Sequence, residues 1–187
     1  YQPIWHKMRD LVNNFNSECA GEIWLLEHNP IYTLGQAADE KHVLNSEKIQ
    51  VIRSDRGGQI TYHGPGQLMV YTIFNLKKLG IGIKSLVCKL EQAVIDMLQE
   101  HKITACRHAG RPGVYVAEKK ICSIGLRVRK GISYHGIAIN INTDKAAFAN
   151  INPCGYKGLE VCNINDYIEG INISSIKTAI VAQLEQQ

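Results

Sequence analysis

The sequence predicts a single α+β domain. Apolar runs typical of β-strands follow one another with short turns between them, and few segments show helical periodicity. A doubly wound fold would instead alternate strands and helices regularly. The chain has 187 residues, of which 45% are hydrophobic; that is enough to bury one core and short for two. We therefore expect one domain over 1–187, with a mainly antiparallel or mixed sheet.

The N-terminal third predicts one helix followed by strands. Apolar side chains recur at helical spacing over 4–16, which favours a helix there. The segments 22–28 and 31–35 have the composition of strands, and an Asn-Pro pair divides them. A further apolar run, KIQVIRSD (48–55), leads into a glycine-rich loop.

The middle of the chain contains the clearest strand and the clearest helix. QLMVYTIFNL (67–76) is rich in β-branched and aromatic residues, which predicts a strand. The segment 83–101 places its apolar residues on one stripe of a helix. That stripe consists of Leu86, Leu90, Ala93, Val94, Met97 and Leu98.

The C-terminal part predicts more strands and a last helix. Two strands are expected within 113–130, joined by a turn at about 117–119, and another at 132–141. A final helix is expected to run to the C-terminus, capped by Ser174 or Ser175.

Composition excludes several classes of partner. The formal net charge is +4, and no run of Lys and Arg is dense enough for a nucleic-acid surface. No apolar stretch approaches the roughly 20 residues that a membrane helix needs. We therefore expect neither nucleic acid nor membrane as a partner. There is no signal-peptide pattern, and because the chain starts at Tyr1 rather than Met we allow for a missing native N-terminus.

The cysteines and histidines predict no metal site. Six cysteines are scattered without any C-x-x-C pair, which argues against a disulfide scaffold and against structural zinc. No H-x-x-x-H spacing occurs among the histidines. We expect a protein of the reducing cytoplasm in which most thiols pack.

The loop RGGQITYHGPGQ (56–67) is the densest cluster of glycine, aromatic and polar residues. A P-loop requires G-x-x-x-x-G-K-[ST], and the dinucleotide fingerprint requires G-x-G-x-x-G at the start of a helix. This loop lacks the lysine and is followed by a strand, so both nucleotide interpretations fail. Glycines beside a strand mark either tight turns or a close approach of ligand to backbone. We favour a ligand site, with Gln59, Thr61 and His63 on one face and Ile60 and Tyr62 on the other.

Cys154 is the best candidate for a nucleophile. It lies in a Pro-Cys-Gly turn, where a rigid and open backbone presents the thiol, although an incidental loop thiol would look the same. A thiol needs a nearby cation or base to form a thiolate. Lys120 has the strand parity of Cys122, so its amine is expected to turn toward the apolar side while Lys119 is solvated. His63 or His135 could instead supply the base, although such residues more often serve as hydrogen-bonded supports.

Four motifs, in this order and spacing, resemble those of the lipoyl(octanoyl) transferases, also called octanoyl-[acyl-carrier-protein]:protein N-octanoyltransferases. They are RGGQITYHGPGQ, KKICSIGLRV, YHGIAIN and INPCGY. The resemblance extends from about residue 22 to about residue 161. It implies the fold of biotin and lipoate protein ligases, with a large mixed sheet and a smaller one flanked by helices.

The resemblance also implies a reaction and its residues. The family's catalytic cysteine falls on Cys154 and its catalytic lysine on Lys120. Its acyl-binding segments fall on Arg56, Gly57, Gly58, Gln59, Ile60, Thr61, Tyr62 and His63, on Ser123, Ile124 and Gly125, and on Gly136, Ile137 and Ala138. An octanoyl group would pass from acyl carrier protein through a cysteine thioester to a lysine of a lipoyl domain.

The expected partners follow from that reaction. They are octanoyl-acyl carrier protein, the lipoyl domains of 2-oxoacid dehydrogenase complexes and the glycine cleavage H protein. No cofactor is expected, because phosphopantetheine arrives on the carrier protein. The alternative is an ATP-dependent lipoate or biotin protein ligase, which would share the fold. Such ligases resemble R-R-x-S-G-G-G-A-V or G-R-G-R-x-G at the loop and have no need of a Pro-Cys-Gly thiol.

Overall fold

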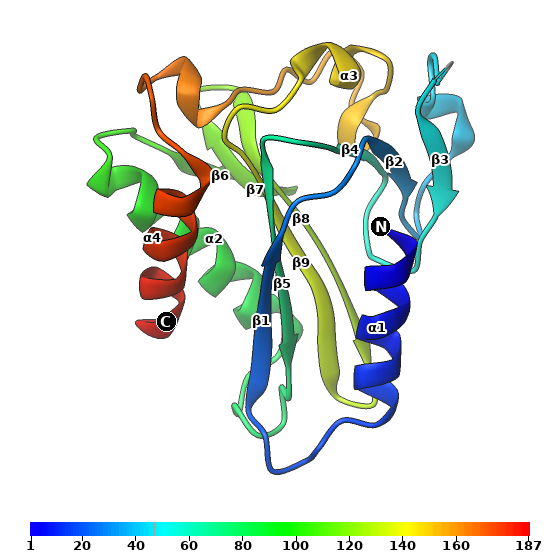
Figure 1. The fold of residues 1–187 in the computed structure, drawn as a ribbon, viewed down its shortest axis with the longest axis vertical. Helices are drawn as coiled ribbons and strands as arrows, with labels where there is room; N and C mark the ends of the chain where they lie inside the picture. Colours follow the sequence, from blue (N-terminus) through cyan, green and yellow to red (C-terminus); the bar gives the residue numbers. More distant parts are fainter. Residues whose placement is uncertain (47) are drawn as a thin grey trace.

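The computed structural model describes residues 1–46 and 48–187, which form two β-sheets and the helices around them (Figure 1). The large sheet has six strands in the order β1-β5-β9-β8-β7-β6. Their bounds are β1 Gly21–Leu26, β5 Gln67–Phe74, β6 Cys106–His108, β7 Arg111–Val116, β8 Lys119–Arg129 and β9 Ile132–Asn140. The α+β class and the pairing of a large sheet with a small one, both predicted above, are confirmed.

Every pairing between the named strands of the large sheet is antiparallel. The expectation of a mixed large sheet is therefore wrong. Tight turns join β7 to β8 and β8 to β9, and such turns can connect only antiparallel neighbours. The parallel pair lies instead in the small sheet, between β2 and β3.

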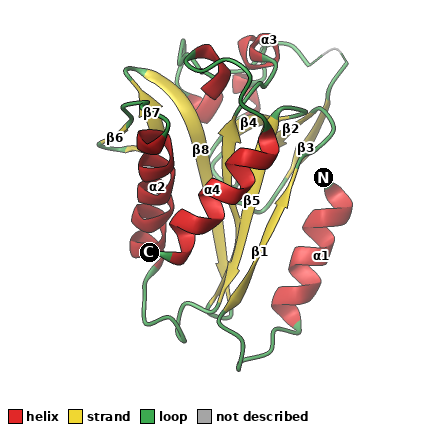
Figure 2. Ribbon diagram, turned by 60° about the vertical axis from the view of Figure 1, so that its left-hand side comes forward, coloured by secondary structure: helices red, strands yellow, loops and turns green. Residues whose placement is uncertain are grey.

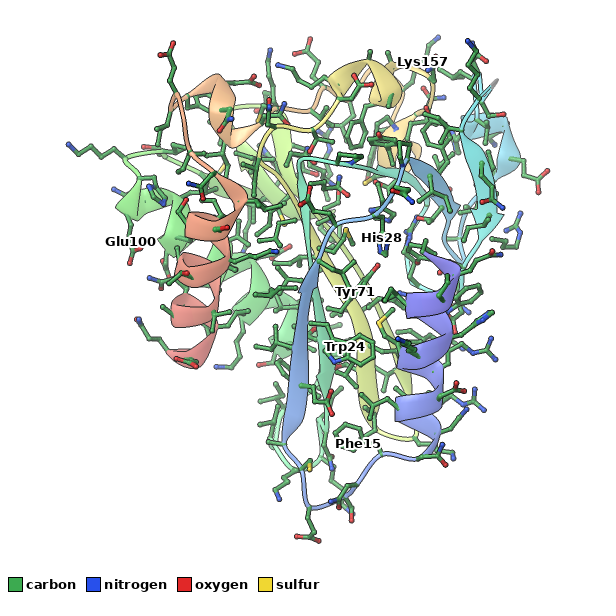
Figure 3. The ribbon with its side chains drawn as sticks, viewed as in Figure 1. Phe15, Trp24, His28, Tyr71, Glu100 and Lys157 are labelled. Atoms are coloured by element: carbon green, nitrogen blue, oxygen red, sulfur yellow. The ribbon has the colours of Figure 1, made fainter. Side chains whose placement is uncertain are left out.

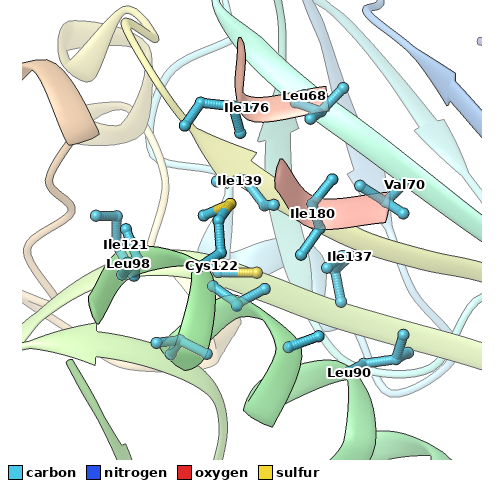
Figure 4. Packing of buried hydrophobic residues seen from close by; sticks show 14 of the residues in the cluster. Leu68, Val70, Leu90, Leu98, Ile121, Cys122, Ile137, Ile139, Ile176 and Ile180 are labelled. Atoms are coloured by element: carbon cyan, nitrogen blue, oxygen red, sulfur yellow. The ribbon is translucent and has the colours of Figure 1, made fainter. Parts of the chain in front are cut away.

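Helices cover both faces of the large sheet. Helices α2 (Ile83–Glu100) and α4 (Ile173–Glu185) pack on one face, and α1 (Gln2–Asn13) packs on the other (Figures 1 and 2). The predicted stripe of α2 is buried, and it packs with Ile137, Ile139 and Cys122 of the sheet (Figure 4). No helix in the described part of the chain is both long and apolar enough to cross a membrane.

The small sheet, in the order β3-β2-β4, stands beside one end of the large one. Its strands are β2 Ile31–Leu34, β3 Gln50–Arg53 and β4 Ile60–His63. Its own core includes Tyr32, Ile60, Tyr62 and Phe148, the last from the short helix α3 (Lys145–Ala149). Single 3₁₀ turns occur at Glu40–His42, Pro153–Gly155 and Ile164–Asp166.

Several local predictions differ from the structure. The cap of α4 is Asn172, whose side chain accepts from Ser175 N, and not Ser174 or Ser175. The predicted helix 4–16 begins at Gln2 because a proline at the start suits the first turn, and it ends at Asn13. The short elements β6 and α3 were not predicted, because three to five residues are too few for a periodic pattern.

Strand β8 contains a β-bulge beside its start. Val114 of β7 lies opposite Cys122, but the next residue, Tyr115, lies opposite Lys120, so Ile121 is the extra residue. A bulge turns the side chains on its two sides toward different faces. Cys122 accordingly enters the core beneath α2, whereas Lys120 faces the opposite side of the sheet, toward the loop of Cys154.

A substitution at Gly136 would test how tightly the central strands β5 and β9 pack. A Cβ at this position would lie 1.9 Å from the carbonyl oxygen of Val70 in β5. We expect Gly136→Ala to lower the free energy of unfolding by about 1–3 kcal/mol, because backbone and not a movable side chain must give way. Urea denaturation would measure it. The matched control is Gly82→Ala, since nothing lies within 4 Å of its Cβ position, and equal stability of the two variants would contradict the prediction.

Candidate active site

Cys154 lies in a strained turn at the junction of the two sheets. Its backbone is left-handed, with φ 56° and ψ 17°, within the 3₁₀ turn Pro153–Gly155. A non-glycine residue in this region costs roughly 1–3 kcal/mol and persists where surrounding structure enforces it. Asn152 N donates to His42 O at 2.9 Å, which ties the turn to the segment after β2. The strain therefore coincides with the predicted nucleophile.

The structure brings Lys120 and Cys154 together. The Lys120 Nζ lies 3.0 Å from the Cys154 Sγ, although 34 residues separate them in the chain. The chain after Cys154 returns to β8 and forms a parallel bridge between Val161 and Lys120. Lys120 N donates to Glu160 O at 2.9 Å, and Cys162 N donates to Lys120 O at 3.0 Å. These bonds fix the turn of Cys154 to the strand that carries the lysine.

Lys120 is only 2% exposed, whereas the Lys119 side chain is 52% exposed and pairs with Glu160. Strand parity correctly predicted a buried Lys120 and a solvated Lys119, but it assigned Lys120 to the wrong face, because the bulge at Ile121 separates Lys120 from the Cys122 face. The Lys120 Nζ also donates to Pro112 O at 2.9 Å. Burial alone lowers the pKa of Lys120, but the charge and hydrogen bond of the Cys154 sulfur outweigh it and the pKa is raised.

Two other thiols are unsuited to nucleophilic work. Complete burial raises the pKa of Cys122 to about 12, so its thiol stays protonated, as expected for a packing residue. Burial likewise raises the pKa of Cys162. All six cysteines are free thiols, and Cys154 is the one whose sulfur receives a hydrogen bond from a buried ammonium.

A cavity of about 140 Å³ opens beside the Lys120–Cys154 pair. Cavities of about 150 Å³ hold a ligand the size of benzene, so this one accepts a small apolar group. Both predicted catalytic residues line it. So do these predicted binding residues: Arg56, Gly58, Gln59, Ile60, Thr61, His63, Ser123, Ile124, Gly125, Gly136, Ile137 and Ala138.

Gly57 and Tyr62 do not line this cavity, so the structure does not support their predicted contact with the acyl group. Gly57 N donates to Leu126 O at 2.9 Å and thereby joins the glycine loop to β8. The ring of Tyr62 lies on the other face of β4, 5.5 Å from that of Phe148. Strand alternation had already separated Tyr62 from Thr61 and His63. Ile60, which alternation had also turned away, does line the cavity.

Arg56 supplies a second buried cation. Its side chain donates to Thr33 Oγ1, Thr33 O, Gly57 O and Gln59 O at 2.6–3.0 Å. Among the described residues no carboxylate forms an ion pair with it. Burial lowers the pKa of Arg56, but an arginine stays protonated in proteins. Thr33, which the sequence did not single out, orients this cation toward the cavity.

Two buried histidines, His63 and His28, lie at or next to the cavity and are held by neutral hydrogen-bond partners. His63 Nδ1 lies 2.8 Å from Gln67 Oε1, and its Nε2 lies 3.2 Å from Thr33 Oγ1. His28 Nε2 lies 2.7 Å from the hydroxyl of Tyr71, a residue of β5, and the two residues are labelled near each other in Figure 3. Burial lowers the pKa of His28 to about 4 and holds that of His63 well below its usual range. His63 therefore acts as a support here and does not contact Cys154.

His135, the other candidate base, also serves as a support. Its Nε2 lies 2.9 Å from Asp55, which further accepts from the Tyr134 hydroxyl at 2.5 Å and from Trp5 Nε1 at 2.7 Å. Burial works in the opposite direction, but these hydrogen bonds hold the pKa of Asp55 well below its usual range. No sequence motif singled out Asp55, although it directly precedes Arg56. His135 Nδ1 and Thr61 Oγ1 are buried without a hydrogen bond in the described residues.

The buried histidines should make stability depend on pH. Unfolded histidine takes up a proton near pH 6.5, whereas His28 in the folded protein resists protonation down to about pH 4. The unfolded state therefore binds more protons in this window, and the free energy of unfolding should fall as the pH decreases from 6.5 to 4. Urea denaturation at a series of pH values would measure it, and His28→Gln should make the fall shallower.

Tyr71→Phe is the control for that experiment, because it removes the hydroxyl bound to His28 and leaves the imidazole in place. It should lower stability by a similar amount across the window and keep the slope. If His28→Gln and the wild type gave parallel curves, His28 would not be the titrating group.

Curated relatives are similar to this chain over most of its length. The octanoyltransferase of Pseudoalteromonas atlantica is 53% identical over 161 residues, which cover 86% of this chain and 74% of that protein. The octanoyltransferase of Enterobacter sp. (strain 638) is 48% identical over 184 residues, which cover 98% of this chain and 86% of that one.

Solved structures share the fold at low sequence identity. Lipoate-protein ligase A bound with ATP superposes with a TM-score of 0.82 at 16% identity, covering 97% of this chain and 78% of that one. The biotin protein ligase of Aquifex aeolicus, in complex with biotin and ATP, gives 0.56 at 14% identity over 82% and 68%. The family model of the lipoyl protein ligase A/B catalytic domain matches residues 1–185. This chain therefore belongs to the lipoyl protein ligase A/B catalytic domain family.

Proposed function

We propose that this protein is an acyltransferase that moves an octanoyl group from octanoyl-acyl carrier protein to a lysine of a lipoyl domain. The observation that carries the proposal is the 3.0 Å contact between Lys120 Nζ and Cys154 Sγ at the wall of a cavity. Relatives about half identical to the chain are octanoyltransferases. This transfer is the first step of endogenous protein lipoylation, in which the cell makes the lipoyl group itself.

In the first step Cys154 takes the acyl group. Its thiolate, stabilised by the Lys120 ammonium, attacks the carbonyl carbon of the octanoyl thioester. A new carbon–sulfur bond forms to Cys154, and the bond to the phosphopantetheine sulfur breaks. The departing thiolate takes a proton from Lys120, which becomes a neutral amine. One thioester replaces another, so this exchange is nearly isoenergetic.

In the second step the acceptor lysine attacks the thioester on Cys154. The neutral Lys120 amine takes the proton that the attacking amine loses. Collapse of the intermediate forms the amide and releases the Cys154 thiolate beside the restored ammonium. An amide is more stable than a thioester, so neither step requires ATP. We expect the reaction to require neither a cofactor nor a metal ion.

The cavity is suited to the hydrocarbon part of the acyl group. Burying about seven carbons at roughly 0.8 kcal/mol each contributes on the order of 5 kcal/mol. Apolar residues such as Met69 and Ala138 line the cavity together with Tyr71 and His135, and its volume is about 140 Å³. We infer that this small volume favours acyl chains of medium length over long ones.

The proposed partners follow from this chemistry. The acceptor is a lipoyl domain. We propose that the acceptors are the lipoyl domains of 2-oxoacid dehydrogenase complexes and the glycine cleavage H protein. The donor is octanoyl-acyl carrier protein. A thioester enzyme with six free thiols suits a reducing compartment, so we place the reaction in the cytoplasm.

The acyl-enzyme provides a direct test. Wild-type protein incubated with octanoyl-acyl carrier protein should gain the mass of one octanoyl group, measured by intact-mass spectrometry. Cys154→Ala should gain none, because the bond forms at that sulfur. Cys106→Ala is the matched control, since Cys106 is an exposed thiol, and it should be acylated like the wild type. If Cys154→Ala still gained the octanoyl group, Cys154 would not be the nucleophile.

The same assay separates the proposal from an ATP-dependent ligase, which shares the fold. Free octanoate with ATP and Mg²⁺ should yield no product, and no ATP should be consumed. ATP-dependent transfer from free octanoate, together with none from the carrier protein, would establish the ligase instead.

Lys120→Ala should slow transfer by about 10²–10⁴-fold, the usual contribution of a general acid–base residue. The rate of octanoyl transfer to a lipoyl domain would measure it, with circular dichroism showing that the fold is kept. Lys119→Ala is the matched control, because the Lys119 side chain is exposed and adjacent, and its rate should stay near that of the wild type. A near-normal rate for Lys120→Ala would remove the lysine from the mechanism.

A further inference from the structure

Glu91 is a buried carboxylate on the apolar side of helix α2. It is 6% exposed and lies between Leu90 and Ala93, both of which are fully buried in the main core. An ionised group in such a place is costly unless it is paired. The core-forming stripe of α2 does not explain it, and neither does the chemistry assigned above.

The two oxygens of Glu91 have different partners. Oε1 accepts from the backbone N–H of Gly113 at 2.8 Å. Oε2 accepts from Arg107 Nε at 3.1 Å. Arg107 is 39% exposed on its side chain and also binds the backbone of Cys88. One oxygen therefore faces an ion pair near the surface, and the other faces a single backbone amide inside the protein.

That amide belongs to the peptide unit that holds Lys120. The N–H of Gly113 and the C=O of Pro112 are the two ends of one planar peptide group. Lys120 Nζ donates to the Pro112 oxygen at 2.9 Å, while it lies 3.0 Å from the Cys154 sulfur. The contacts thus run from Glu91 through one peptide to Lys120 and on to Cys154.

We propose that Glu91 is a positioning residue for the Lys120–Cys154 pair, acting through the Pro112–Gly113 peptide. Its carboxylate orients this peptide and polarises it, so that the Pro112 carbonyl holds the Lys120 ammonium more strongly. The inference rests on the proposed transfer reaction, in which Lys120 must first be an ammonium beside the thiolate. Among the described residues no ion pair joins Glu91 to Lys120 directly.

Low polarity around the peptide makes this coupling effective. Hydrogen bonds in series strengthen one another where the local dielectric constant is low, and Gly113 is buried. The backbone of Gly113 has φ +124°, and a Cβ there would lie 2.5 Å from Cys122 O and 3.1 Å from Lys120 Cε. The peptide is therefore packed against both the bulged strand and the stem of the lysine, so a small shift of the peptide moves the amine.

The simpler alternative is that Glu91 only fastens α2 to the start of β7. Two variants separate these roles, because both break the Glu91–Arg107 ion pair. Glu91→Gln removes the charge but keeps an oxygen that can accept from Gly113. Arg107→Gln removes the outer partner and leaves the carboxylate on the Gly113 amide. A fastening role predicts that both lose stability and that neither changes the chemistry of Cys154.

The measurement is the rate at which iodoacetamide alkylates Cys154, followed on the peptide that contains it, as a function of pH. In Glu91→Gln we expect alkylation at pH 7 to be about tenfold slower, with kcat for octanoyl transfer reduced by a similar factor and KM for the donor unchanged. Arg107→Gln should keep the wild-type alkylation rate to within about twofold. Thermal unfolding of both variants controls for loss of fold.

Equal alkylation profiles for Glu91→Gln and the wild type would overturn the proposal, as would equal slowing in the two variants. If Glu91→Gln does not fold, Glu91→Asp replaces it. That variant keeps the charge but draws it away from Gly113, so it should also slow alkylation, and a wild-type rate would again overturn the proposal. Alkylation needs no octanoyl substrate, so failure of the proposed function would appear separately, as a wild-type protein that takes up no octanoyl group.

Discussion

The contact between the Lys120 amine and the Cys154 sulfur is the constraint on which the rest of the site depends. A thiol and an amine 34 residues apart must be held 3.0 Å from each other. The backbone departs from regular structure at both places. A bulge at Ile121 re-aims the lysine, and a left-handed turn presents the cysteine. A parallel bridge between Val161 and Lys120 joins the segment that follows the turn to the bulged strand.

The rest of the site combines charged and neutral groups. Two cations, Lys120 and Arg56, line the cavity and are bound by backbone carbonyls. Tyr71 and His63 line it too, and burial keeps the histidine neutral. In the proposed reaction the thioester is polar at its carbonyl and apolar along its chain, so the Lys120 ammonium beside Cys154 marks the place of the carbonyl. Both sheets are needed, because each supplies one wall.

The fold itself does not decide between transferase and ligase. A lipoate-protein ligase bound with ATP superposes well on this chain at 16% identity, so the same two sheets support an enzyme that binds a nucleotide. The difference lies in local chemistry. Here the glycine loop has no lysine for phosphate, and a thiol in a Pro-Cys-Gly turn meets a buried ammonium instead. Function on this fold is therefore set by a few side chains and by the backbone that aims them.

Local pattern in the sequence determined the α+β class and the long helix α2, and it singled out Cys154 and Lys120 as candidates, because periodicity, strand composition and motif spacing are properties of neighbouring residues. The tertiary structure alone decided how these parts meet. It made the large sheet antiparallel and brought Thr33, Asp55 and Glu91 to the site. Parity correctly predicted that Lys120 and not Lys119 is buried, yet the bulge at Ile121 decides which face Lys120 occupies. A bulge and a long-range hydrogen bond depend on strand pairing, and no local pattern records which strands will pair.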